Sequence, residues 1–283
     1  ETRIAIGSGT VTTDGTNTIA IGTSADAGAA DTVSIGRSAG SSTGTVSAYA
    51  VNIGYQANGS STYNIGSNSV SIGRGSKATN LYAVSMGYLA GNTTGSVGQT
   101  ATSIGPQANN GTSNIGGGSV AVGDSADSIG ATSVAIGNRA VATGSSAICI
   151  GKQANVTGTQ SVAIGQGASA AGNSSFAMGS TANAANNSSV AIGSSAKVQA
   201  DNGTAIGSGA EMHGTSGVSI GYRSGATTGT VGSNTVTIGP DANKGTHDVG
   251  AGSIAIGFDT FTQGDNAIAI GKSSTASADE SMC

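Results

Sequence analysis

The chain has 283 residues, of which 49 are glycine and none is tryptophan, and its net charge is −4. Aromatic residues make up only 3% of it and charged residues 8%, so it has too few large side chains to fill a thick globular core. The lysines and arginines form no cluster, which argues against a nucleic-acid or anionic-membrane partner. No apolar run is long enough to span a bilayer.

A short apolar motif that ends in glycine recurs along the whole chain. Its closing glycines are Gly7, Gly22, Gly36, Gly54, Gly73, Gly87, Gly105, Gly123, Gly137, Gly151, Gly165, Gly179, Gly193, Gly207, Gly221, Gly239, Gly257 and Gly271. From Gly123 to Gly221 the step is 14 residues without exception, as in SVAIG at 133–137, 161–165 and 189–193. Such a short fixed period predicts a solenoid and excludes a disordered chain, because Val and Ile recur in strict register.

The motif itself predicts a β-strand with two different faces. Val or Ile usually stands three residues before the glycine and Ile stands directly before it, while the residue between them is small. Apolar residues two positions apart share one face of a strand. We therefore expect the Val and Ile side chains inside the coil and the small row outside, against sister chains. On this view Ile164→Asp would block folding by burying a charge.

A second strand is predicted after each glycine. Three residues after the glycine stands Ala, Ser or Thr, and in the 14-residue units the position two further on is usually small or apolar, as at Ala142 and Val156. Gly or Asn then marks the far corner, as at Gly144 and Asn186. The coil thus reads strand, turn, strand, turn, in one β-roll repeat domain over residues 1–283.

Longer units of 18 or 19 residues interrupt the period in three pairs, at 37–73, 88–123 and 222–257. The pairs are copies of one another: RSAGSSTGTV at 37–46 aligns with YLAGNTTGSV at 88–97 and YRSGATTGTV at 222–231. Since the apolar motif continues through them, we expect the coil to continue and the extra residues to leave it as loops, where binding residues often lie.

Units such as SVAIGQGASAAGNS resemble the head repeats of YadA-like trimeric autotransporter adhesins, which also occur in bacteriophage tail fibres. The resemblance covers nearly the whole chain. It implies a left-handed parallel β-roll, a side-by-side homotrimer, and attachment to a surface. The chain carries fewer charges than adhesin heads usually do, and no coiled-coil stalk or membrane-anchor barrel follows from its sequence.

Tyrosine is the residue type with the most distinctive distribution. Tyr49, Tyr55, Tyr63, Tyr82 and Tyr88 lie within 40 residues of one another, and only Tyr222 lies elsewhere. Exposed tyrosines could stack on sugar rings or anchor a protein partner. The alternative is that they cover loop edges or the interface between chains. His247 joins them as a candidate, because the three loop copies differ most around it.

Evidence for catalysis, metals or cofactors is lacking in the sequence. His213 and His247 have no cysteine or carboxylate at ligand spacing, so an intrachain metal site is not expected, although a lone histidine could bind an ion on a trimer axis. Asp124 and Asp127 form the closest acidic pair inside the rod of coils, and we expect solvated turn residues rather than general acid–base groups. Cys149 takes a small-residue position, and two cysteines, Cys149 and Cys283, form no disulfide framework.

These patterns favour a non-enzymatic trimeric fibre segment, without cofactors, that presents a binding face to a host-surface glycan or protein. A virion fibre from a phage tail is preferred over the head of a bacterial adhesin because of the sparse charge; either would be extracellular. An ice-binding protein is a weaker alternative, since Thr12, Thr13, Thr235 and Thr237 form no sustained ladder. A polysaccharide-cleaving spike would require a carboxylate pair that the sequence does not show.

Overall fold

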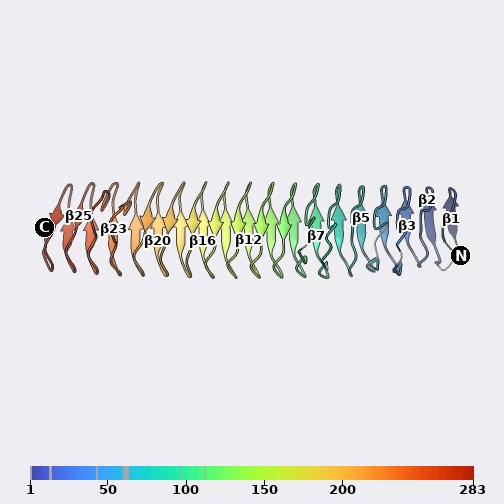
Figure 1. Cartoon of the computed structure of the whole chain (residues 1–283), viewed down its shortest axis with the longest axis horizontal. Helices are drawn as coiled ribbons and strands as arrows, with labels where there is room; N and C mark the ends of the chain where they lie inside the picture. Colours follow the sequence, from blue (N-terminus) through green and yellow to red (C-terminus); the bar gives the residue numbers. More distant parts are fainter. Residues whose placement is uncertain (1, 13–14, 43, 60–63, 96, 112) are drawn as a thin grey trace. The chain divides into compact units, whose positions relative to one another are not determined.

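The computed structural model describes residues 2–12, 15–42, 44–59, 64–95, 97–111 and 113–283. The chain divides into two compact units, Glu1–Ser146 and Ala147–Cys283. Within the described residues every regular element is a β-strand. Each unit is a parallel β-solenoid in which one coil follows another along the chain (Figure 1).

The first unit has a sheet of nine parallel strands, one from each motif. They are β1 (Arg3–Ile6), β2 (Thr18–Ile21), β3 (Val33–Ile35), β4 (Val51–Ile53), β5 (Val70–Ile72), β6 (Val84–Met86), β7 (Thr102–Ile104), β8 (Val120–Val122) and β10 (Val134–Ile136). Equivalent motif positions pair in register, for example Val33 with Val51. A second, shorter sheet contains β9 (Asp127–Ser128) and β11 (Val141–Ala142).

The second unit repeats this plan with more of the second sheet. Its motif strands are β12 (Ile148–Ile150), β14 (Val162–Ile164), β16 (Phe176–Met178), β18 (Val190–Ile192), β20 (Thr204–Ile206), β22 (Val218–Ile220), β23 (Val236–Ile238), β24 (Ile254–Ile256) and β26 (Ile268–Ile270). The second sheet runs through β13 (Asn155–Val156), β15 (Ser169–Ala170), β17 (Asn183–Ala184), β19 (Lys197–Val198) and β21 (Glu211–Met212). A separate pair follows, β25 (Phe261–Thr262) with β27 (Thr275–Ala276).

The prediction of which motif face points inward was wrong. The small middle residue of every motif strand except β1 is buried, as Ala163 shows with 0% exposure, whereas the Val and Ile side chains lie on the outer face. Ile136, for example, is 38% exposed and Ile164 is half-buried. The reason is thickness: each coil is two short strands joined by tight turns, so the facing sheets are filled mostly by small side chains such as Ala, Ser and Thr.

Side chains across this thin interior are matched in size. The expected inward position three residues after the motif glycine is confirmed, since Ala154, Ala168 and Ala182 are essentially fully buried. Two of the larger buried residues on the second strand face a glycine instead of serine: a Cβ on Gly203 would lie 2.7 Å from Cγ1 of Val198, and one on Gly217 would lie 2.9 Å from Cε of Met212. At these two positions the missing glycine side chain leaves room for the larger residue.

The motif glycines form a column in which one backbone lies directly on the next. Gly54 has φ +130°, and a Cβ there would lie 2.7 Å from the carbonyl oxygen of Gly73 in the following coil. Gly221 is similar, with φ +135° and a Cβ position 2.6 Å from the oxygen of Gly239. Any side chain at these positions would push neighbouring coils apart, which explains why the motif always closes with glycine.

The longer units leave the coil at defined residues, which confirms the predicted loops. In the first coil of each looped pair the chain leaves the second strand at Gly40, Gly91 or Gly225, all with positive φ. In the second coil of each pair it leaves at Asn58, Asn109 or Asn243, with φ of 48°, 50° and 46°. Each asparagine is buried. Its amide nitrogen donates to the motif strand, and its oxygen accepts the N–H of Ala78, Ser128 or Thr262 in the next coil.

Candidate functional site

The structure divides the predicted tyrosines between two corners of the coil. Tyr55 and Tyr88 directly follow motif glycines. Tyr49 and Tyr82 lie in the turn before the motif strand, both with positive φ, at 58% and 54% exposure. Tyr222 lies in the second unit and Tyr63 lies outside the described residues. The sequence cluster therefore does not form one aromatic patch.

Tyr55 and Tyr88 belong to a ladder that runs over four consecutive coils of the first unit. The residue after the motif glycine is in turn Arg37, Tyr55, Arg74 and Tyr88, and we call these four residues the Arg–Tyr ladder. The Arg37 guanidinium carbon lies 4.5 Å from the centre of the Tyr55 ring. That of Arg74 lies between both rings, 5.8 Å from Tyr55 and 5.6 Å from Tyr88. These are cation–π distances.

The second unit carries a related column at the same position of its coils. There the residue after the motif glycine is Tyr222, Pro240, Phe258 and then Lys272. Lys272 lies 5.8 Å from the centre of the Phe258 ring, and both Tyr222 and Phe258 are exposed. The neighbouring charges are partly neutralised, because Asp241 pairs with Lys244 at 3.0 Å and lies 3.9 Å from Arg223.

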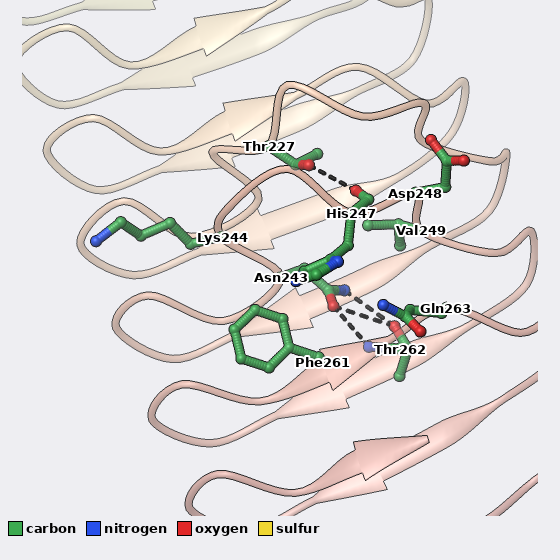
Figure 2. Close-up of a pocket in the computed structure, with 9 residues that line it drawn as sticks. All are labelled: Thr227, Asn243, Lys244, His247, Asp248, Val249, Phe261, Thr262 and Gln263. Atoms are coloured by element: carbon green, nitrogen blue, oxygen red, sulfur yellow. Dashed lines mark hydrogen bonds between the residues drawn. The ribbon is translucent and has the colours of Figure 1, made fainter. Parts of the chain in front are cut away.

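His247 lies at the base of the loop in the second unit, beside a shallow surface hollow (Figure 2). Its ring meets Phe261 edge-on at 5.7 Å, and its carbonyl oxygen accepts a hydrogen bond from Thr227. Asn243 lies beneath it, bonded to Thr262. The hollow has no interior room for a water molecule. His247 thus packs against the base of the loop, and the hollow beside it is no enclosed binding cavity.

Two carboxylates have shifted pKa values for opposite reasons. Hydrogen bonds from the Thr230 hydroxyl and backbone N–H lower the pKa of the exposed Asp248. Burial raises the pKa of Asp127. Asp127 lies on β9, beside a small hollow lined by Asn109 and Asn114, so the prediction of a solvated turn residue was wrong for it. Among the described residues no three metal-ligating side chains come together.

The outer face of the motif sheet is an extended apolar surface in each unit. In each unit two columns of mostly Val and Ile side chains run along nine parallel strands, for about 40 Å at the usual strand spacing. Ile104 and Met86 in the first unit, and Ile148 and Met178 in the second, are 37–39% exposed. A continuous apolar surface of this length marks an interaction site.

The sequence analysis did not identify three sets of residues that the structure makes prominent. The Val and Ile columns were assigned to the interior. Arg37 and Arg74 were not considered, although aligning the units on their glycines shows arginine and tyrosine alternating. The loop-base asparagines, such as Asn243, follow an alanine four residues after the glycine, but Asn155 and Asn183 do so in regular coils, so this pattern alone does not predict a loop.

Comparison with protein families gives a consistent result. The YadA head domain repeat matches residues 4–39, 65–90, 115–210 and 249–282 in overlapping copies, together more than half of the chain. The unmatched stretches fall mainly in the looped units. No curated protein matches the chain. Within the described residues there is no helix long and apolar enough to cross a membrane. The head repeats of this family are structural adhesive segments rather than enzymes, and the chain belongs to the YadA head domain repeat family.

Proposed function

We propose that the chain is a homotrimeric fibre segment that holds a binding surface outside its parent cell or particle. The observation that carries this is the outer apolar face of each unit, with Ile136 and Ile148 each 38% exposed in a single chain. Sister copies would cover these columns by apolar contact. Head domains of the family form trimers and bind host surfaces, which supports three copies rather than two.

Sedimentation analysis of the wild-type chain tests the trimer. We expect a mass three times 26.6 kDa. Ile192→Asp, on the outer face of β18, should reduce the mass to one chain while circular dichroism still shows β-structure. Ser194→Asp adds the same charge at an exposed corner of the same coil and should stay trimeric. A wild-type mass of 26.6 kDa would contradict the proposal.

For the parent structure we propose a phage tail fibre, on the ground that only 8% of the residues are charged. A bacterial adhesin head is the second candidate, and the match to the head repeat is compatible with either parent. The two make different predictions for immunoelectron microscopy with antibodies against the chain. Label on virion fibres supports the first, and label on the bacterial surface supports the second.

A further inference from the structure

We propose that the Arg–Tyr ladder is a binding site for an acidic glycan, with sulfate or carboxylate groups on the guanidiniums and sugar rings against the tyrosines. This inference rests on the proposed role in surface attachment and names a ligand class for it. It concerns only the first unit, where all four residues lie.

Charge is the first argument for this site. The chain as a whole is acidic, with a net charge of −4. Yet Arg37 and Arg74 are both exposed, two coils apart, and neither has a carboxylate within salt-bridge distance among the described residues. The adjacent corner column in these coils is Ser38, Gln56, Gly75 and Leu89, which is uncharged. The ladder is thus a local positive stripe with unused charge.

Geometry is the second argument. The guanidinium carbons lie 4.5–5.8 Å from the centres of the tyrosine rings, and each guanidinium carries five N–H donors that an anionic group can accept. Like groups recur every second coil, about 10 Å apart. That spacing is comparable with a disaccharide, so successive acidic sugars of one glycan chain could reach Arg37 and then Arg74.

Rigidity is the third argument. The strands β3 to β6 pair in continuous parallel register, so the four side chains stand on fixed backbone rather than on a loop. The cation–π contacts also hold the arginines in place before a ligand arrives, which reduces the entropy lost on binding. Tyr88 remains 43% exposed, so it still offers a ring edge and a hydroxyl to a sugar.

Isothermal titration calorimetry with the full chain tests this site against three octasaccharides: a heparin fragment, an oligogalacturonate and neutral maltooctaose. We expect binding of at least one acidic octasaccharide and none of maltooctaose. Binding of heparin alone assigns a sulfate ligand, and binding of the galacturonate assigns a carboxylate ligand. No binding of either acidic glycan, or equal binding of maltooctaose, would overturn the inference.

Matched variants show whether the ladder is responsible. Arg37→Gln with Arg74→Gln should weaken binding at least about tenfold and Tyr88→Ala about threefold or more. Arg139→Gln, an exposed arginine elsewhere in the unit, and Tyr82→Ala, on the other corner, should change affinity less than about twofold. Equal losses in Arg139→Gln would show non-specific charge attraction and overturn the site.

Separate measurements test the glycan site and the trimeric fibre. Sedimentation reports the trimer without any glycan. Attachment of the labelled chain to host cells, competed by the acidic octasaccharide, links the two: attachment that the octasaccharide leaves unchanged would retain the attachment role but overturn the ladder as its site. Loss of attachment in the double arginine variant, with the trimer intact, would support it.

Discussion

In the second unit, the regular coils of residues 147–221 and the looped pair of residues 222–257 solve the same packing problem differently. In the regular coils, β13 to β21 form a continuous second sheet over the small core. In the looped pair this sheet is absent between β21 and β25, while the motif strands β22 to β24 continue in register. The motif sheet therefore carries the coil, and the second sheet can be replaced.

Backbone bridges between the two loops and one buried side chain replace it. Asn243 donates to Thr237 on the motif strand at 3.1 Å and accepts the N–H of Thr262 in the next coil at 2.8 Å. These bonds satisfy polar groups that would otherwise be buried without partners. An asparagine that bonds the motif strand to the next coil thus allows a loop to leave the coil at this point, while the motif strands keep their register.

The largest expected effect comes from breaking the glycine column of a regular coil. Gly165→Ala places a Cβ 2.7 Å from the carbonyl carbon of Gly179 at φ +134°, so we expect destabilisation of at least about 3 kcal/mol. Gly167→Ala, two residues on, meets nothing closer than 3.5 Å and should cost about 1 kcal/mol. Urea unfolding followed by circular dichroism measures both; equal losses would refute the stacking argument.

A smaller loss is expected when the asparagine of the looped pair is removed. Asn243→Ala leaves the Thr262 N–H and Thr237 hydroxyl without their partner, which should cost about 2–3 kcal/mol. Asn202→Ala removes an exposed asparagine of similar positive φ from a regular coil and should cost about 1 kcal/mol or less. Hydrogen exchange at Thr262 should accelerate only in the first variant, and unchanged exchange there would contradict the bridging role.

Acidification should act on the looped pair more than on the regular coils. The pKa of Asp248 is lowered by its bonds to Thr230, so the stabilisation from those bonds is present above the ordinary Asp pKa and is lost as pH falls through the folded value. Carboxyl NMR titration should give a low pKa in wild type and a higher one in Thr230→Ala. The same low value in both would show that the hydroxyl bond is irrelevant.

The smallest effect concerns Asp127, which follows a looped pair in the first unit. Burial raises its pKa, so its contribution to stability falls as pH rises through the interval between its unfolded and folded values. Asp127→Asn should therefore raise the melting temperature by about 1–2 °C at pH 7. At a pH below both pKa values the two proteins should melt together, and a difference persisting there would point to another cause.

The sequence predicted the coil but not its orientation. The fixed period, the glycine corners and the loop positions followed from residue spacing alone, and the buried Ala168 and Ala170 confirm the second strand. Alternation separates two faces of a strand without saying which is inside. Val and Ile usually prefer the interior. Here the coil is thin and its interior is filled mostly by small side chains, so Val and Ile lie on the outer face, where they could contact other chains.

The candidate site was less predictable than the fold. Tyr55 and Tyr88 were singled out correctly as corner residues, but Tyr49 and Tyr82 were grouped with them by proximity in the sequence. In a solenoid, neighbours in space are residues one coil apart, so Arg37 lies against Tyr55, whereas Tyr49 lies in the turn before the motif strand. The proposed glycan site depends on contacts that only the coil register brings together.

Circular dichroism of two adjacent aspartate variants tests the central claim most directly, namely that Ala lies inside the coil and Ile outside it. Ala163 is fully buried and Ile164 is half-buried on the outer face of β14. Ala163→Asp should abolish the β-sheet spectrum by placing a charge in the core, whereas Ile164→Asp should keep that spectrum. Loss of the spectrum in Ile164→Asp with retention in Ala163→Asp would contradict the account.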